Sequence, residues 1–374
     1  MISKALVVGA YQKKCTELAR LPGLELTVVV PESWQEPGGR RLAAERAFVD
    51  GYRLQVTPIA FNGHFHLHYY PGLGPLVRAE APDILHIDEE PYNLATWQAL
   101  RLGKSVGARC LFFTWQNLYR RYPPPWQWVE REVFAGADYA LAGNVEAVTV
   151  LRRKGYAGPV AVVPQFGVDP AVYRPLPGEP RSGTFTVGYL GRLVEEKGLL
   201  VLLRALGHLD GDWRLEVVGE GPLRPRMEAL ARELEIAERI GYTPGVPSTE
   251  VPALLNRWDC LVLPSLSRPN WKEQFGRVLI EAMACQLPVV GSSSGEIPVL
   301  VGEAGLIVPE GDAPALAGAL SRLRADPGLR ASLGAQGRAR VLARYTQQEI
   351  ARQTYAVYRT MLGDHAPETE ATKA

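Results

Sequence analysis

The feature of this sequence that most constrains its fold is a regular alternation of short apolar runs with amphipathic segments. Residues 24–30, 84–87 and 109–114 have the length and composition of buried strands, and residues 94–105 have a helical spacing of apolar positions. Strands that alternate with helices form a mainly parallel sheet with helices on both of its faces. The sequence therefore predicts an α/β protein.

Residues 166–183, which are rich in proline and glycine, interrupt this alternation. The pattern of strands and helices resumes after them, and 374 residues are enough for two domains. We therefore expect two Rossmann-like domains, residues 1–177 and 178–343, that face each other across a ligand-binding cleft. We further expect a helix over residues 344–362 that crosses back to the first domain, and a disordered tail over residues 363–374.

The charge and cysteine content exclude several classes of function. The chain has 41 Lys and Arg residues against 40 Asp and Glu residues, so no overall positive field attracts nucleic acid. Its four cysteines are far apart and lack metal-binding spacing, which is typical of the reducing cytoplasm. No apolar run in the sequence approaches the length of a membrane span, which is ~20 residues. We interpret residues 1–9 as a first buried strand rather than as a signal peptide.

A glycine-rich turn with two cations follows the strand expected at residues 184–190. Residues 188–198 read G-Y-L-G-R-L-V-E-E-K-G, and Arg192 and Lys197 can both point at one anion from this loop. A helix that begins beyond the loop adds backbone donors and a favourable dipole. A guanidinium and an ammonium together suit a pyrophosphate group. The alternative is an ordinary βα turn with two solvated cations, because glycine-rich turns are common.

Two glutamates lie near the end of a later strand. Glu273 falls in the loop after that strand, whereas Glu281 lies within the apolar helical run 278–283 and needs a polar partner there. A carboxylate at this edge of a sheet can accept two hydrogen bonds from a vicinal diol of a ribose or hexose. The alternative for Glu273 is a solvated loop charge.

Four segments of the second half, in the same order and with the same spacing, resemble the family 4 glycosyltransferases, which are retaining enzymes of the GT-B fold. These segments are G-R-L-V-E-E-K-G at 191–198, V-V-G-E-G-P at 217–222, E-Q-F-G-R-V-L-I-E-A-M-A at 273–284 and P-V-V-G-S-S-S-G-E-I-P at 288–298. In the first half, the phrase P-Q-F-G-V-D at 164–169 and the strand-helix pattern resemble the family.

The resemblance implies a role for each matching residue. The diphosphate and the ribose of a nucleotide sugar are held by Gly191, Arg192, Lys197 and Glu281. The donor sugar is contacted by Glu273, Phe275, Gly276 and Gly295. The residues expected to act in catalysis are Glu273, Arg192 and Lys197. Such enzymes generally need no metal, so we expect neither a metal nor another cofactor beside the nucleotide sugar.

The acceptor side departs from the family pattern. The family often has a histidine two residues after the threonine that ends a central strand, and this chain has Gln116 after Thr114 and Trp115. His86 and Glu89 lie at the end of strand 84–87 and are further candidates for the acceptor side. The acidic residues there could equally cap the helix that follows.

Two other segments have alternative interpretations. His64, His66 and His68 would share one face of a strand, as metal ligands can, but we prefer a polar strand face or the rim of an acceptor cleft. Residues 115–126 are aromatic, basic and proline-rich, which favours acceptor recognition or contact with the inner face of a membrane. A rigid surface loop is the alternative there.

The expected function is transfer of a hexose-type sugar, with retention of anomeric configuration, in cytoplasmic glycan biosynthesis. The resemblance implies a UDP- or GDP-linked donor and a sugar, glycan, lipid or small-molecule acceptor. The alternatives are a non-catalytic nucleotide-sugar-binding protein, or an enzyme of the same fold such as a nucleotide-sugar epimerase. Nucleic acid is not an expected partner.

Overall fold

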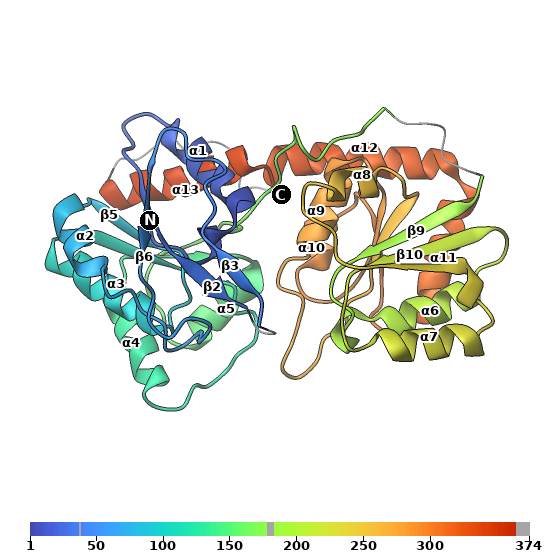
Figure 1. Ribbon diagram of the computed structural model, residues 1–374, viewed down its shortest axis with the longest axis horizontal. Helices are drawn as coiled ribbons and strands as arrows, with labels where there is room; N and C mark the ends of the chain where they lie inside the picture. The colour runs from blue at the N-terminus through green and yellow to red at the C-terminus, as the bar shows by residue number, and fades with distance from the viewer. Residues whose placement is uncertain (37–38, 178–182, 364–374) are drawn as a thin grey trace. The chain divides into compact units, whose positions relative to one another are not determined.

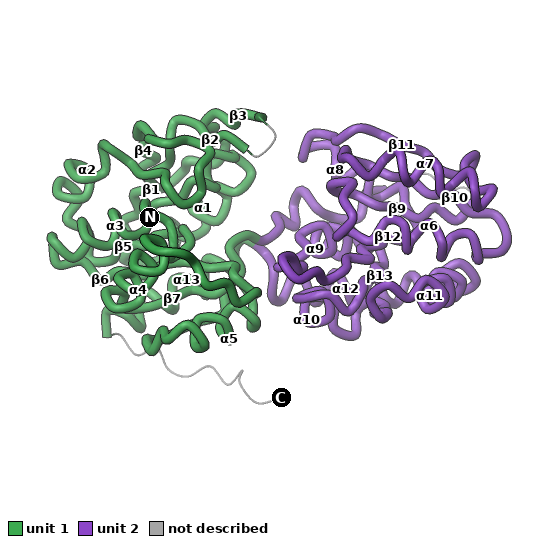
Figure 2. Tube along the Cα trace, turned by 90° about the horizontal axis from the view of Figure 1, so that it is seen from below, with its two compact units in different colours: residues 1–166, 347–374 green, residues 167–346 purple. Residues whose placement is uncertain are grey.

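The computed structural model describes residues 1–36, 39–177 and 183–363. The chain divides into two compact units (Figure 2): unit 1 contains residues 1–166 and the chain from residue 347 onward, and unit 2 contains residues 167–346. The sequence pattern predicts the first boundary at residue 177, eleven positions later on the chain and within the proline- and glycine-rich segment 166–183. Residues before 177 pack on unit 2, because the Leu176 amide donates to Asn256 Oδ1 at 2.8 Å and Val168 pairs with Thr346. The tail expected at 364–374 lies outside the described residues.

Unit 1 is built on two parallel ladders of strands (Figure 1). Ile2 pairs with Val29 of one ladder and Ile87 of the other, and thereby joins them. The strands of the first ladder are β1 (Thr27–Pro31) and β4 (Arg53–Thr57), and those of the second are β5 (Ile84–Ile87), β6 (Arg109–Thr114), β7 (Tyr139–Ala142) and β8 (Val160–Val162). A separate antiparallel pair consists of β2 (Ser33–Gln35) and β3 (Arg41–Ala43).

The helices of unit 1 follow the expected alternation and include the last helix of the described residues. They are α1 (Lys13–Ala19), α2 (Leu73–Glu80), α3 (Leu94–Ser105), α4 (Trp126–Gly136), α5 (Val145–Arg153) and α13 (Gln347–Leu362), with 3-10 turns at Ala5–Val7 and Gly9–Gln12. The strand expected over residues 1–9 is reduced to the pairing of Ile2. The chain turns into a 3-10 helix at Ala5, because Ser3 and Lys4 are anchored by Asp88 and Glu89.

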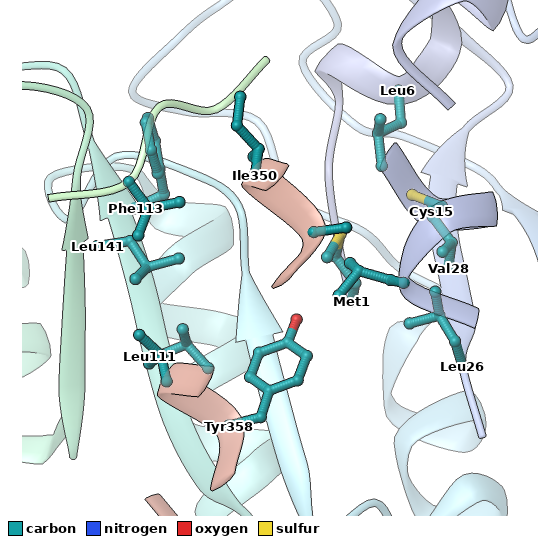
Figure 3. Close-up of a cluster of buried hydrophobic side chains, with 14 of the residues drawn as sticks. Met1, Leu6, Cys15, Leu26, Val28, Leu111, Phe113, Leu141, Ile350 and Tyr358 are labelled. Atoms are coloured by element: carbon teal, nitrogen blue, oxygen red, sulfur yellow. The ribbon is translucent and has the colours of Figure 1, made fainter. Parts of the chain in front are cut away.

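The core of unit 1 lies on both faces of its sheet. Leu111 and Phe113 of β6 belong to one cluster, whereas Cys110 and Phe112 belong to the other, as alternation along a strand requires. Figure 3 shows Ile350 and Tyr358 of α13 in the first cluster, with Leu111 and Phe113. Helix α13 therefore completes the core of unit 1, although almost all of that unit precedes residue 167.

Unit 2 contains one six-stranded parallel sheet in the order β11-β10-β9-β12-β13-β14. The strands are β9 (Phe185–Leu190), β10 (Trp213–Val218), β11 (Ile240–Thr243), β12 (Cys260–Leu263), β13 (Val289–Ser292) and β14 (Leu306–Val308). The helices are α6 (Leu199–Gly207), α7 (Arg224–Glu233), α8 (Val251–Leu255), α9 (Arg277–Ala284), α10 (Ile297–Val301), α11 (Ala313–Ala325) and α12 (Pro327–Arg344), with 3-10 turns at Glu195–Lys197 and Ala237–Arg239.

The order of the strands in the sheet predicts where unit 2 binds a ligand. The connection from β9 leads outward through β10 to β11, and β12 returns to the other side of β9. The direction of winding reverses between β9 and β12, and ligands bind at such reversals, outside the carboxyl ends of the strands. No helix of the described residues is both long enough and apolar enough to cross a membrane.

Candidate functional site

The glycine turn after β9 fits closely against neighbouring backbone. Gly198 has a φ of +70°, and a Cβ atom there would lie 1.8 Å from the carbonyl oxygen of Pro264. Gly219, at the end of β10, has a φ of +140°, and its Cβ would lie 2.0 Å from the carbonyl oxygen of Gly191. These two positions accept glycine alone without displacing backbone. The turn that carries Gly191, Arg192 and Lys197 is thus fixed between β10 and β12.

Lys197 and Glu273 lie in direct contact at the carboxyl edge of the sheet. Lys197 Nζ is 2.6 Å from Glu273 Oε2, and the Ser265 hydroxyl donates to the same carboxylate oxygen at 2.8 Å. The ammonium also lies 5.0 Å from the centre of the Trp271 ring. The fold therefore joins a cation from the glycine turn and a carboxylate from the loop after β12, as strands that end at one edge of a sheet allow.

Arg192 occupies a different environment. Its side chain is 68% exposed, and its nearest ionic neighbour is Glu196, at 4.0 Å. The Tyr189 hydroxyl donates to the Arg192 carbonyl at 2.8 Å, which fixes the backbone but leaves the guanidinium in solvent. Arg192 is available to an anionic ligand from this position, whereas Lys197 already has the Glu273 carboxylate as a partner.

The other residues expected near the donor sugar gather at the start of α9. Gly295 has a φ of +54°, and a Cβ there would lie 1.9 Å from the Glu273 carbonyl oxygen. Gly276, with a φ of +80°, immediately precedes α9. The Phe275 ring is buried and packs edge-on against Tyr345, with 6.1 Å between the ring centres. The Phe275 ring therefore belongs to the interior of unit 2.

Glu281 is buried in α9 and has two polar partners. Arg277, one turn earlier, places Nε 2.8 Å from Glu281 Oε1, and Tyr173 is hydrogen-bonded to the same carboxyl group. Burial raises the pKa of Glu281, and Arg277 and Tyr173 oppose that shift. Neither partner was anticipated from the sequence. Arg277 could have been found from its i,i+4 spacing to Glu281, but Tyr173 lies more than a hundred residues earlier.

In unit 1, Glu89 and His86 are internal. Glu89 forms an ion pair with Lys4 and accepts the Lys4 backbone N–H at 2.9 Å. Burial raises the pKa of Glu89, but Lys4 and His68 outweigh this effect and hold it at about 2. His86 Nδ1 lies 2.6 Å from the Tyr358 hydroxyl, and burial lowers the pKa of His86. The observed contacts of both side chains hold separate segments of unit 1 together.

Gln116 follows β6 and is held by hydrogen bonds at its backbone and at both ends of its amide. Its backbone N–H donates to Thr114 Oγ1 at 3.0 Å, and its Nε2 donates to the Tyr122 hydroxyl at 3.2 Å. The Lys154 ammonium donates to its Oε1 at 2.9 Å. Only 8% of the residue is exposed. The involvement of Lys154 was not predicted, because the sequence R-R-K looks like a solvated basic run.

Glu90 stabilises the turn on which Gln116 lies. Its carboxylate accepts the Thr114 hydroxyl at 2.6 Å and the Trp115 backbone N–H at 2.8 Å. Burial raises the pKa of Glu90 to about 7, although Thr114, Trp115, Lys4 and Lys154 all favour the charged form. Glu90 belongs to the same acidic cluster as Glu89, but the sequence pattern favours Glu89 as the acceptor-side candidate.

The three histidines at 64, 66 and 68 do not lie on a strand. His68 is fully buried and His64 is exposed. His66 lies among the rings of Tyr92 and Trp126, with ring centres 5.2 and 5.4 Å away. In the parts of the chain that the structure describes, no group of three or more His, Cys, Asp or Glu side chains is arranged to hold a metal ion.

Comparison with known proteins identifies the class of protein. Residues 177–340 match the family model described as "Glycosyl transferases group 1". The whole chain is similar to a sucrose-phosphate synthase from Thermosynechococcus elongatus, with 22% identity and a TM-score of 0.69 over 95% of this chain and 93% of that one. It is also similar to the Anabaena protein Alr3699/HepE in complex with UDP and glucose, with 18% identity and a TM-score of 0.69 over 96% and 98% of the two chains. The fold is GT-B, with two Rossmann-like units.

Two curated relatives of this chain are glycosyltransferases with named donors or acceptors. A GDP-mannose-dependent alpha-(1-6)-phosphatidylinositol monomannoside mannosyltransferase of Mycolicibacterium smegmatis is 38% identical over 156 residues, or 40% of this chain and 41% of the relative. A D-inositol 3-phosphate glycosyltransferase of Streptomyces bingchenggensis is 33% identical over 254 residues, or 61% and 54%. The matched segments thus span about half of these relatives or less. Both relatives are glycosyltransferases, and together with the family-model match over residues 177–340 they support the prediction, made from the motifs, of a family 4 glycosyltransferase.

Proposed function

We propose that this protein transfers a hexose-type sugar from a UDP- or GDP-linked donor to a glycan, lipid or small-molecule acceptor, with retention of anomeric configuration. The observation that carries the proposal is the contact between Lys197 and Glu273 at the carboxyl edge of the unit 2 sheet. It brings a cation for a diphosphate next to a carboxylate for sugar hydroxyls. The names of the relatives support both nucleotides, since one is GDP-mannose-dependent and a similar structure contains UDP and glucose.

In this proposal unit 2 binds the donor. Arg192 and Lys197 neutralise the diphosphate beside Gly191, and Glu281 accepts hydrogen bonds from the ribose hydroxyls. Glu273, together with the backbone at Phe275, Gly276 and Gly295, orients the sugar. The two cations supply positive charge where the leaving group becomes more negative, so we propose that no divalent metal and no other cofactor takes part.

Unit 1 then binds the acceptor, and Gln116 is its candidate contact. A glutamine amide does not titrate near neutrality and cannot serve as a general base. We therefore propose that the leaving diphosphate takes the proton. The acceptor oxygen bonds to the anomeric carbon, the bond from that carbon to the phosphate oxygen breaks, and the acceptor proton passes to the departing oxygen. Glu89 and His86 are given structural roles, because both are about 2% exposed.

We place the protein in the cytoplasm, with a peripheral contact at the inner face of the membrane. The loop before α4 and the start of that helix support this contact. Trp128 is 50% exposed, Tyr119 is exposed, and the Arg153 guanidinium lies 4.2 Å from the centre of the Tyr119 ring. Aromatic and basic side chains together suit an anionic lipid surface. Sedimentation with phosphatidylglycerol vesicles, but not with phosphatidylcholine vesicles, is the expected result, and Trp128→Ala should weaken it.

The experiment that tests the function has two stages. A thermal-shift panel of UDP, GDP, ADP and their sugars identifies the donor, because a ligand at 100 times its Kd stabilises the folded state by about 2.7 kcal/mol. Proton NMR of the product then reports the anomeric configuration. Retention is expected. Tight binding of a nucleotide sugar without turnover on a broad acceptor panel would instead identify a binding protein, and an inverted product would contradict the mechanism.

A further inference from the structure

The amide of Gln116 is oriented by its neighbours within unit 1. The Lys154 ammonium lies 2.9 Å from the amide atom assigned as Oε1. An ammonium group donates hydrogen bonds and accepts none, so the amide must turn its oxygen toward Lys154. The amide nitrogen then lies at the opposite end, 3.2 Å from the Tyr122 hydroxyl. One charged neighbour thus determines which end of Gln116 donates.

Lys154 is itself held rigidly. Its side chain is only 5% exposed, and its Nζ lies 2.6 Å from Glu130 Oε1 and 4.6 Å from the centre of the Tyr122 ring. Glu130 belongs to α4, Lys154 follows α5, and Gln116 follows β6, so the contact joins three elements of the fold. A buried ion pair is a poor way to gain stability, because apolar residues of similar size often do as well. The charge at this position therefore calls for another explanation.

We propose that Lys154 is a positioning residue that fixes Gln116 as a hydrogen-bond donor toward bound substrate. An amide nitrogen carries two N–H groups, and the Tyr122 hydroxyl can take only one of them at a time. The other N–H is left for a ligand. The subsite at Gln116 then binds a ligand oxygen that can accept a hydrogen bond, such as a sugar hydroxyl or ether oxygen. It disfavours a ligand amine in the ammonium form.

Two further contacts support this orientation. The Gln116 backbone N–H donates to Thr114 Oγ1, whose own proton goes to Glu90. The backbone of the turn and the side-chain amide are therefore held by different hydrogen bonds, the first to Thr114 and Glu90 and the second to Lys154. A substitution at Lys154 should free the amide and leave the turn in place.

The inference rests on the proposed function for its substrate, but the position of the amide can be measured without turnover. In protein labelled with ¹⁵N-glutamine, Gln116→Ala assigns the side-chain amide resonances of Gln116. We expect an NOE from these protons to the Tyr122 ring in the native protein. The NOE should disappear in the double variant Lys154→Met with Glu130→Gln, which also avoids leaving a buried carboxylate unpaired. An unchanged NOE and chemical shift in the double variant would overturn the inference.

The kinetic test compares the same double variant in two backgrounds. In the native background it should lower kcat/KM for transfer by about 3- to 10-fold, the size expected for one neutral hydrogen bond. In the Gln116→Ala background it should have no further effect, because the group that it positions is gone. Equal losses in both backgrounds would mean a purely structural role.

Lys104→Met is the matched control, because Lys104 also pairs with a carboxylate of unit 1, that of Asp138, without contacting Gln116. It should change neither measurement. Nucleotide affinity should stay unchanged in every one of these variants, because the proposed nucleotide site lies in unit 2. If the native protein shows no transfer at all, the proposed function fails, and the NOE still decides whether Lys154 orients the amide.

Discussion

Glu90→Gln should change how the stability of unit 1 depends on pH. Burial raises the pKa of Glu90 to about 7 from an ordinary 4.5, so folding favours the protonated carboxyl. This contribution to stability is fully present below pH 4.5 and is lost as the pH rises through about 7. At about 1.4 kcal/mol per pH unit, the difference between the two values corresponds to about 3 kcal/mol. A glutamine does not titrate, so the stability of the Glu90→Gln variant lacks this pH-dependent contribution.

The assay is urea unfolding of the native protein and of Glu90→Gln at several values between pH 4.5 and 8. Hydrogen exchange in peptides that contain β6 assigns the transition to unit 1, since the two units can unfold separately. Relative to the variant, the free energy of unfolding of the native protein should fall by about 3 kcal/mol as the pH rises across this range. Taking the difference between the two proteins removes the contributions of other titrating groups, such as His66 and Glu281.

The control is Glu132→Gln, the same substitution at an exposed glutamate of α4. A difference between native protein and Glu90→Gln that stays constant with pH would refute the reasoning, because it would mean that the carboxyl of Glu90 titrates alike in the folded and unfolded chain. A difference of the opposite sign would mean that the Thr114 and Trp115 hydrogen bonds outweigh burial.

The remaining predictions concern the proposed donor site in unit 2. Lys197→Met should weaken binding of the preferred nucleoside diphosphate, measured by calorimetry, by about 1.5–3 kcal/mol, the cost of one charged hydrogen bond. Glu273→Gln should mainly lower turnover, which steady-state kinetics measures. Glu281→Gln should reduce the preference for ribose over deoxyribose nucleotides, and equal losses for both would argue against a ribose contact. Transfer should persist in EDTA; activity lost in EDTA and restored by one divalent ion would contradict the proposed role of Arg192 and Lys197.

The fold class and the resemblance to glycosyltransferases could be predicted from the sequence because both depend on local patterns. Strands and helices alternate visibly, and several glycines of unit 2, among them Gly198, Gly219 and Gly295, lie where close backbone contacts leave no room for a Cβ. Gly198, for example, has the carbonyl of Pro264 where a Cβ would be. Positions under such a constraint keep a recognisable order along the chain.

The polar contacts of unit 1 could not be predicted in the same way. In a sheet covered on both faces, every residue of a strand is buried, so the pattern around His86 does not reveal which face its ring occupies. Its partner Tyr358 lies on α13, 272 residues later in the sequence. The partners of Gln116 are also remote in sequence, and Lys154 looks like one member of an exposed basic run.

The histidine segment shows a different limit. Alternate histidines share a face only if the backbone is extended, and here it is not. Phe61 and Gly63, with φ angles of +52° and +89°, turn the chain immediately before His64. The glycine could have been taken as a sign of a turn, but a phenylalanine in the left-handed region has no such signal. The expectation of a shared face therefore failed at the level of the backbone.

The charged groups around Gln116 in unit 1 decide whether a protein base is available for the proposed reaction. Lys154 and Glu130 form an ion pair, and Gln116 does not titrate. Glu90 lies close to Gln116 in the fold, and its pKa of about 7 suits a general base. Its two oxygens already accept the Thr114 hydroxyl and the Trp115 N–H, which favours a structural role. The variant Glu90→Gln separates the two possibilities. If the leaving diphosphate takes the proton, transfer by this variant should persist above pH 7. If Glu90 were the base, transfer would be abolished at every pH, and the proton would leave through unit 1 instead.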